Sequence, residues 1–470
     1  MGNSRATLGV DLHVEPSAAG GLRRGLTDAL RDAVRTGRLA AGTRLPSSRS
    51  LAADLGIARN TVAEAYADLV AEGWLTARQG SGTRVATGVA TAPTGRREKA
   101  APPRRRVSDR PAYDLKPGTP DLAAFPRAEW LKAARRALGA APSEALGYGD
   151  PCGRPELRTA LAGYLSRSRG VRADPDNILV CAGISHGLRI LATVLRARGA
   201  GSVAVESYGL DVHWRILAAA GLATHPLPYD ELGTDTGDLA GTDAGAVLLT
   251  PAHQFPMGTS LRPDRRAAAV DWARRTGGFV LEDDYDGEFR YDRRQPVGAL
   301  QGLAPEHVVY LGTASKSLAP GLRLAWMVLP PSLARECAAA KGDSDTCGVL
   351  EQLTLAEFLT SGAYDRHVRA ARLRYRRRRD ALVAALAARA PEVRVTGIAA
   401  GLHAVLRLPQ GSEPPVVQAA AWQGLALHGL SFYRHEQARA ERPDALVVGY
   451  GTPPDHAWAG ALEALCRVLP

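Results

Sequence analysis

One lysine of the sequence stands where an amine could do chemistry. Of the 59 basic residues only five are lysines, and the rest are arginines. Lys316 lies in the stretch GTASKSLAPGLRLAW, directly after a short apolar run and before a Pro-Gly turn. A lysine amine can form a Schiff base with an aldehyde, whereas an arginine cannot be deprotonated to act as a nucleophile. Lys316 is therefore a candidate for a lysine that binds an aldehyde cofactor.

A cofactor bound in this way also needs an acidic group, and one follows another apolar run. The run FVLE at 279–282 is followed closely by Asp283 and Tyr285. A carboxylate beside a pyridine nitrogen keeps that nitrogen protonated, so that the ring can act as an electron sink. The spacing predicts that Asp283 supports such a ring, with Tyr285 in the same turn.

Two segments could bind the phosphate of such a cofactor. The turn CAGISHG follows the run ILVC and opens a helix, so the amides of Gly183, Ile184 and Ser185 can cup an anion. Side-chain donors close to the lysine are Thr313, Ser315 and Arg323. Each piece alone could be an ordinary surface feature. In chain order, and each after an apolar run, they predict a single site.

Short apolar runs predict the strands that would position these groups. They are ILVC (178–181), VAVE (203–206), AVLLT (246–250), FVLE (279–282), VVYL (308–311) and AWMVL (325–329). Each is apolar on both faces, as parallel strands covered by helices must be. Ligands bind at the carboxyl ends of such strands. The sequence predicts an α/β body with a mostly parallel central sheet. The segments 402–408 and 445–450 predict a smaller α+β C-terminal subdomain.

The region 20–86 has a different pattern, which predicts a winged helix-turn-helix. Apolar residues recur at helical spacing from Leu22, Ser47 or Ser48 can cap a second helix, and Gly56 can end it. A third helix follows a short turn, and two short strands around QGSG form a hairpin wing. This geometry lays the third helix in the major groove of DNA.

Several residues of this region are placed to contact DNA. They are Arg44, Ser48, Arg49, Arg59, Asn60 and Thr61, with Gly80, Ser81, Gly82 and Arg84 at the wing. Most of the formal net charge of +11 lies in the first 110 residues, which favours a polyanionic partner. The alternative is a small helical dimerisation domain whose arginines are merely solvated.

Length and composition set the remaining expectations. The 470 residues are too many for one core and predict an arm (1–19), the helix-turn-helix domain (20–86), a basic Pro/Ala/Arg linker (87–112) and the α/β body (113–470). No apolar run is long enough for a membrane span, and the first residues lack the apolar stretch of a secretory signal, so none is expected. The five cysteines are scattered without a CxxC pair, which predicts reduced thiols, no metal site and a cytoplasmic location.

Both parts of the chain resemble known families. GRLAAGTRLPSSRSLAADLGIARNTVAEAYADLVAEGWL and GSGTRV resemble the winged helix-turn-helix of GntR-type regulators, although Ala58 stands where that family usually has a capping serine. Residues 113–470 resemble the fold-type-I aminotransferases, and SK-LAP-LRL is similar to the signature of their regulatory branch. The whole chain is similar to MocR-type (GabR-like) transcriptional regulators.

The resemblance implies a set of roles for named residues. Lys316 would carry pyridoxal 5′-phosphate (PLP) as a Schiff base, Asp283 would pair with the pyridine nitrogen, and Tyr285 would bond the ring hydroxyl. The phosphate would be held by Thr313, Ser315, Arg323 and Ser185. Tyr148 would reach the phosphate of the partner subunit in a head-to-tail, domain-swapped homodimer.

The chain departs from the aminotransferase pattern near the ring and near the substrate carboxylate. Phe255 stands where many members have an asparagine, and His253 or Gln254 are candidates to replace it. Amino-acid-sensing members carry an arginine near the C-terminal strand, where this chain has Gly451 and Thr452. An amino-acid ligand is therefore less expected, because a buried carboxylate without a cation is penalised.

A third departure concerns the residue that stacks on the ring. Leu210 stands at the place of the usual tyrosine, and Tyr208 or His213 are candidates to stack instead.

The predicted function is a PLP-dependent DNA-binding regulator that senses an amino acid, another amine or PLP itself, with weak or absent transaminase activity. The alternative is an active aminotransferase with an appended DNA-binding domain.

Overall fold

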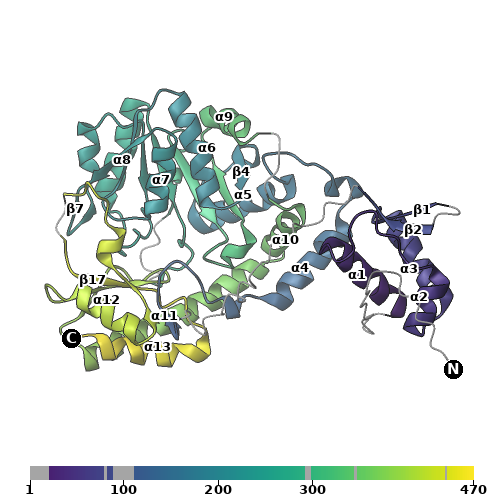
Figure 1. Cartoon of the computed structure of the whole chain (residues 1–470). Helices are drawn as coiled ribbons and strands as arrows, with labels where there is room; N and C mark the ends of the chain where they lie inside the picture. Colours follow the sequence, from purple (N-terminus) through teal and green to yellow (C-terminus); the bar gives the residue numbers. More distant parts are fainter. Residues whose placement is uncertain (1–20, 79–81, 88–110, 292–297, 343–346, 440–441) are drawn as a thin grey trace. The chain divides into compact units, whose positions relative to one another are not determined.

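The computed structural model describes residues 21–78, 82–87, 111–291, 298–342, 347–439 and 442–470 (Figure 1). They form two compact units, one within residues 1–107 and the other within 108–470. The predicted arm (1–19), the wing tip at Gly80 and Ser81 and most of the predicted linker (87–112) lie outside the described residues. The exact domain boundaries stay a prediction.

The N-terminal unit has the elements of a winged helix-turn-helix. They are α1 (Leu22–Arg35), α2 (Ser48–Leu55), α3 (Arg59–Ala71), β1 (Leu75–Arg78) and β2 (Gly82–Val85). Ser47 caps α2 by accepting a hydrogen bond from the amide of Ser50, and Gly56 ends it with a φ of 67°. The predicted fold of this unit is confirmed, with β1 and β2 as an antiparallel wing.

A small apolar core holds these elements together. Leu26 and Leu30 of α1 pack with Val62 and Leu69 of α3, and all four are buried. Leu22, which belongs to the same predicted stripe, is half exposed at the start of α1. The inward face of α3 is thus fixed by packing, and its N-terminal residues are left at the surface.

The larger unit is built around a seven-stranded sheet. Its strands are β4 (Ile178–Cys181), β5 (Ser202–Glu206), β6 (Ala223–Leu227), β9 (Ala246–Leu249), β10 (Phe279–Asp283), β11 (Val308–Thr313) and β12 (Ala325–Val328). They lie in the order β4–β12–β11–β10–β9–β5–β6. All are parallel except β12, which is antiparallel to both of its neighbours. The mostly parallel sheet is confirmed, but the expectation that 325–329 is a parallel strand is wrong.

Strand β6 is a second difference from the sequence prediction. Its residues ATHPL alternate between exposed and half-buried, because β6 is an edge strand with one face near solvent. The other strands are buried throughout. A continuous apolar run therefore predicts the central strands of the sheet, but it does not predict the edge strand β6.

Helices cover both faces of the sheet, and alternate strand residues reach the two layers. Leu179 and Cys181 face the layer of α6 (Ile184–Ala197), α7 (Asp211–Ala219) and α9 (Pro331–Lys341). Ile178 and Val180 face the layer of α5 (Pro155–Arg169) and α10 (Val349–Thr360), and α4 (Arg127–Ala140) packs on α10. On this second face α8 (Pro263–Thr276) covers β9 and β10. The two-sided burial explains the continuous apolar runs.

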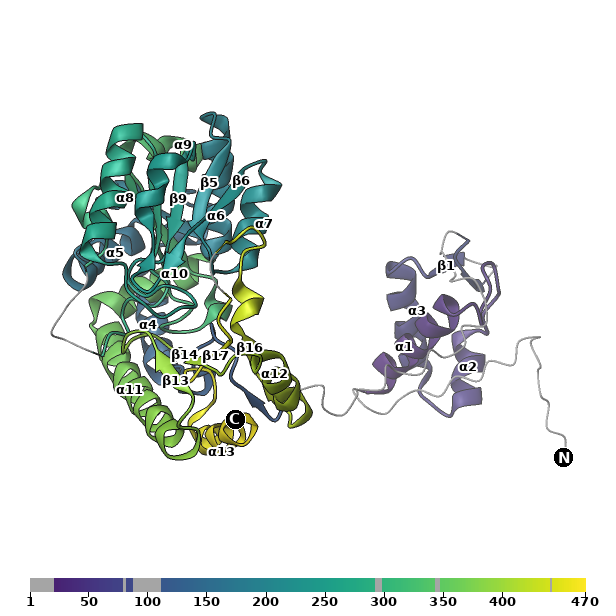
Figure 2. The same ribbon diagram turned by 90° about the vertical axis from the view of Figure 1, so that its left-hand side faces the viewer.

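The C-terminal part forms the predicted α+β subdomain, which lies below the sheet in both views (Figures 1 and 2). Its antiparallel sheet has the order β13–β14–β17–β16, with β13 (Arg394–Thr396), β14 (Ala404–Arg407), β16 (His428–Gly429) and β17 (Ala445–Val448). Its helices are α11 (Ala363–Arg389), α12 (Glu413–Trp422) and α13 (Asp455–Val468).

Two further pairs of short strands lie in the larger unit. Two-residue ladders join β3 (Tyr113–Asp114) to β15 (Leu425–Ala426), and β7 (Tyr229–Asp230) to β8 (Gly233–Thr234). None of the described helices is long and apolar enough to span a membrane.

Candidate functional site

A cavity of about 380 Å³ opens at the carboxyl ends of the central strands. Its wall includes Asp283 at the end of β10, Lys316 after β11, and Gly183 after β4. The ends of these strands therefore meet at one cavity. Of the residues predicted to bind the cofactor, those lining the cavity are Lys316, Asp283, Tyr285, Thr313, Ser315, Arg323, Gly183, Ile184, Ser185 and Tyr208.

Lys316 projects into this cavity from the turn after β11. Its Nζ atom donates a hydrogen bond to the carbonyl of Gly118, which comes from the start of the unit. Burial lowers the pKa of the Lys316 amine, and the nearby carboxylates Asp283 and Asp286 oppose this effect. A lowered amine pKa increases the fraction of the nucleophilic, uncharged form.

Asp283 lines the same cavity and has one acceptor without a partner in the described part of the chain. Its Oδ1 atom is buried and has no hydrogen-bond partner among the described residues. Burial raises the pKa of the Asp283 carboxyl to about 7, and the positive charge of Lys316 lowers it. A buried acceptor without a partner is costly, so a donor placed in the cavity would stabilise this carboxylate.

A cradle for an anion lies where α6 begins. Gly183 precedes the helix with a φ of 95°, and the Nη2 atom of Arg323 donates to the carbonyl of Ala182. A Cβ atom at Gly183 would lie 2.7 Å from that Nη2 atom, so only glycine lets the guanidinium approach. The Oγ1 atom of Thr313 donates to Oγ of Ser315 over 2.9 Å. Backbone amides, hydroxyls and a guanidinium thus converge.

His253 lies behind this wall and does not line the cavity. Its Nδ1 atom lies 3.1 Å from the Tyr285 hydroxyl and 2.8 Å from Oδ2 of Asp286. Gln254 is also turned away, because its amide donates to Thr234. Phe255 itself lines the cavity. The structure therefore places His253 as a support for Tyr285.

Both candidates for stacking on a ring reach the cavity wall. Tyr208 is buried and meets Tyr229 edge to face. His213 is buried at the start of α7, and burial lowers the pKa of its imidazole to about 4, with a smaller effect from Lys316. Leu210 also lines the cavity.

Several wall residues were not predicted, among them Glu206 and His403. Glu206 ends β5 and accepts hydrogen bonds from Thr250 and Thr234, and burial raises the pKa of its carboxyl to about 8. The sequence could have indicated Glu206, because it is the last residue of a predicted strand and the other site residues also follow strands. His403 comes from the C-terminal subdomain, and its place in the wall depends on tertiary packing that no local pattern reveals.

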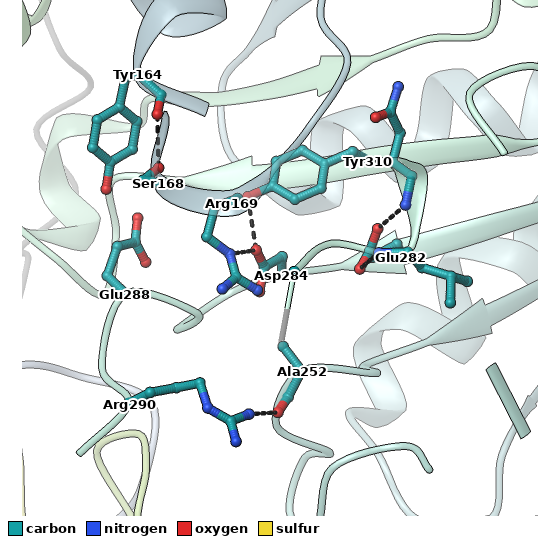
Figure 3. Close-up of polar contacts among 12 residues, drawn as sticks. Tyr164, Ser168, Arg169, Ala252, Glu282, Asp284, Glu288, Arg290 and Tyr310 are labelled. Atoms are coloured by element: carbon teal, nitrogen blue, oxygen red, sulfur yellow. Dashed lines mark hydrogen bonds and ion pairs between the residues drawn. The ribbon is translucent and has the colours of Figure 1, made fainter. Parts of the chain in front are cut away.

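A buried ion pair anchors the chain directly after Asp283, at Asp284 (Figure 3). Arg169 at the end of α5 pairs with Asp284, with 2.6 Å between Nε and Oδ2 and 3.0 Å between Nη2 and Oδ1. The hydroxyl of Tyr310 on β11 donates to the same carboxylate over 2.8 Å. The ion pair thus joins a helix to the strand end next to Asp283.

Tyr148 lies elsewhere on the unit. Its side chain is fully exposed and does not line the cavity of its own chain. Exposed leucines occur on α4 and in the segment that follows, namely Leu131, Leu138 and Leu146.

The N-terminal unit presents most of its predicted DNA-contacting residues to solvent. Arg44, Arg49, Arg59, Asn60, Gly82 and Arg84 are exposed, and Ser48 and Thr61 are half-buried. Two acids of α3, Glu64 and Asp68, pair with Arg23 of α1, and Glu72 just after α3 pairs with Arg31. Arg59 is exposed at the N-terminal end of α3.

Comparison with known proteins agrees with this two-part structure. Residues 22–85 match the model of bacterial regulatory proteins of the gntR family, and residues 114–430 match that of aminotransferase class I and II. An archaeal alanine:glyoxylate aminotransferase shares the fold, with a TM-score of 0.68 and 24% identity over 76% of this chain and 90% of that chain. Kynurenine aminotransferase of Pyrococcus horikoshii has a TM-score of 0.67 and 26% identity to this chain. The match covers 77% of this chain and 90% of that chain.

Two curated relatives extend over both parts. The probable rhizopine catabolism regulatory protein MocR of Rhizobium meliloti is 34% identical, covering 87% of this chain and 86% of its own length. The pyridoxine biosynthesis transcriptional regulator PdxR of Corynebacterium glutamicum is 35% identical, covering 91% of each. The chain belongs to the MocR-type transcriptional regulators, in which a GntR-family helix-turn-helix is joined to an aminotransferase-like domain.

Proposed function

We propose that this regulator binds PLP through Lys316 and that the state of this site controls its affinity for operator DNA. The observation that carries the proposal is the cavity itself, in which Lys316, the unpartnered Oδ1 of Asp283 and the Arg323 cradle converge. The same chain carries a DNA-binding unit. A change in the cavity would then shift the population between arrangements with different DNA affinity.

The residues of the cavity fit PLP group by group. The unpartnered carboxylate oxygen of Asp283 suits a protonated pyridine nitrogen, and the Tyr285 hydroxyl suits the ring hydroxyl. The amides at the start of α6, together with Ser185, Thr313, Ser315 and Arg323, suit the phosphate. When bound, PLP supplies an electrophilic carbon that reacts with amines.

The alternative of an active aminotransferase shares this cofactor site. The names of the curated relatives favour regulation, since those that match both parts are called regulators. Incubation of the PLP-loaded protein with an amino acid and a keto acid separates the two functions. Repeated turnover would establish the aminotransferase, and a single change in absorbance without turnover supports the sensor.

A head-to-tail homodimer is part of the proposal. The exposed side chains of Leu131, Leu138, Leu146 and Tyr148 offer an apolar surface that a second copy would cover. In that dimer Tyr148 would reach the partner's phosphate site. We place the protein in the cytoplasm, where it meets chromosomal DNA.

Replacing Gly183 by alanine is expected to weaken PLP binding by at least about tenfold, which is about 1.4 kcal/mol. The new Cβ atom would displace the Arg323 guanidinium, which lies 2.7 Å from its position. A PLP titration followed by absorbance measures the effect. Gly199→Ala is the control, because Gly199 has a φ of 90° but nothing within 4 Å of the added carbon. Equal PLP affinity in the Gly183 variant and wild type would refute the cradle.

Replacing Arg59 by alanine is expected to cost about 1–3 kcal/mol of operator binding if this side chain reads a base. Arg59 is exposed at the first turn of α3, where side chains of a recognition helix reach the groove. Fluorescence anisotropy on an operator selected from random duplexes measures the affinity. Arg35→Ala removes an exposed arginine from α1 and should have little effect. Unchanged binding by the Arg59 variant would move recognition elsewhere.

The cofactor part of the proposal has a direct test. Full-length protein is incubated with PLP, reduced with borohydride and analysed by mass spectrometry after digestion. A covalent adduct on the peptide that contains Lys316 supports the proposal. Its absence, or an adduct on another lysine, contradicts it.

A further inference from the structure

Much of the cavity wall that remains beside the proposed cofactor groups is apolar or aromatic. This part includes Leu210, Trp214, Phe255, Leu402 and Tyr433. Phe255 and Tyr433 meet edge to face, with ring centroids 5.1 Å apart. Such a wall stabilises apolar or aromatic groups through burial, and it offers few hydrogen bonds to a charged ligand.

The cavity has no spare positive charge among its described lining residues. Its strong bases are Lys316, which the proposed function assigns to the cofactor, and Arg323, which it assigns to the phosphate. The other basic residues in the wall are His213 and His403. Burial lowers the pKa of His213 to about 4 and that of His403 to about 3, so both rings are neutral near pH 7.

The β17 region also brings no cation to the cavity. Val447 is fully buried in an apolar cluster with Tyr208, Phe255 and Tyr433. A side chain at Gly451 would collide with Leu402, since its Cβ atom would lie 2.8 Å from that of Leu402. An arginine at Gly451 therefore has no room toward this wall.

Acidic groups share the same wall. Asp283 and Glu206 both line the cavity, and the Glu206 carboxyl already accepts hydrogen bonds from Thr250 and Thr234. A ligand carboxylate placed among these groups would be desolvated without a cation to pair with it. A ligand amine would meet carboxyl groups and aromatic rings, which can accept its N–H hydrogen bonds.

We propose that the effector is a primary amine with an apolar or aromatic body and no carboxylate. This inference rests on the proposed function, because the amine is the group that reacts with the cofactor's aldehyde. It goes further in assigning the chemical class of the ligand. The apolar wall binds the body of the ligand by burying it. The amino acid that carries the same side chain is excluded, because no cation among the described wall residues is free to pair with its carboxylate.

Matched pairs of ligands test the inference on the full-length, PLP-loaded protein. The pairs are phenethylamine with phenylalanine, tryptamine with tryptophan, and isoamylamine with leucine, each differing only by the carboxylate. Absorbance of the bound cofactor and affinity for selected operator DNA are followed at each concentration. We expect the amines to give half-maximal change at concentrations at least about tenfold lower than the amino acids.

A substitution at the rim of the cavity tests whether the lack of a spare cation in the described wall causes the preference for amines. Leu210 lines the cavity and is partly exposed, so Leu210→Arg can place a cation there. The variant is expected to reduce the preference for amines by about tenfold. Leu232→Arg adds the same charge at an exposed leucine that does not line the cavity, and should keep the preference. An unchanged preference in a stable Leu210 variant would overturn the charge argument.

The outcomes separate this inference from the function on which it rests. If the PLP absorbance band forms but amino acids act as strongly as amines, the inference is wrong and the PLP site stands. If the band forms and neither class changes absorbance or DNA affinity, PLP itself is the signal and the inference is also wrong. If no band forms, the proposed function fails first.

Discussion

Lys316→Ala is expected to abolish covalent attachment of PLP and the long-wavelength absorbance of the bound cofactor. No other lysine among the described residues lines the cavity, so nothing there replaces the lost amine. The Lys316 amine is buried and bonded to the carbonyl of Gly118, and its removal leaves that single acceptor without its donor. The cost to folding should stay near 1–3 kcal/mol, which a stable unit of this size survives.

The matched control is Lys341→Ala. Lys341 is also partly buried and donates to the carbonyls of Pro151 and Val180, but it does not line the cavity. It should keep the absorbance band and the borohydride-trapped adduct. A normal band in the Lys316 variant would assign the attachment to a different residue.

Arg169→Ala is expected to lower the free energy of unfolding of the larger unit by about 3–5 kcal/mol. The side chains of Arg169 and Asp284 are only 6% and 1% exposed, so the alanine variant leaves a buried carboxylate without its cation. The Tyr310 hydroxyl would remain as one donor to Asp284 (Figure 3). Because Asp284 follows Asp283 directly, the variant should also weaken PLP binding.

Denaturant unfolding, followed by circular dichroism, measures this loss. Arg167→Ala provides the control from the same helix, since its guanidinium is exposed and, among the described residues, donates only to the carbonyl of Gly163. Its unfolding midpoint should lie close to that of the wild type. An equally small effect of Arg169→Ala would mean that the ion pair contributes little to the anchoring of the strand end.

Much of the site could be predicted because its groups follow recognisable strands. Lys316, Asp283 and Gly183 each come after an apolar run, and parallel strands bring their carboxyl ends to one edge. The strand direction of β12 was not predictable in this way, since an apolar run carries no information on direction. The edge strand β6 was missed because one of its faces meets solvent.

Contacts that depend on distant segments were not predictable. His253 was expected near the ring from its place in the chain, yet its ring turns to Tyr285 and Asp286. His403 reaches the cavity only because the C-terminal subdomain packs against the sheet unit. In both cases tertiary packing sets where the side chain points.

We propose that occupancy of the PLP site controls DNA binding. The operator affinity of the full-length protein, measured with and without PLP in wild type and in Lys316→Ala, tests this directly. We expect PLP to change the wild-type dissociation constant by at least about fivefold, a coupling of about 1 kcal/mol or more, and to leave that of the variant unchanged. Equal wild-type affinities with and without bound PLP, in the presence and absence of amines, would contradict it.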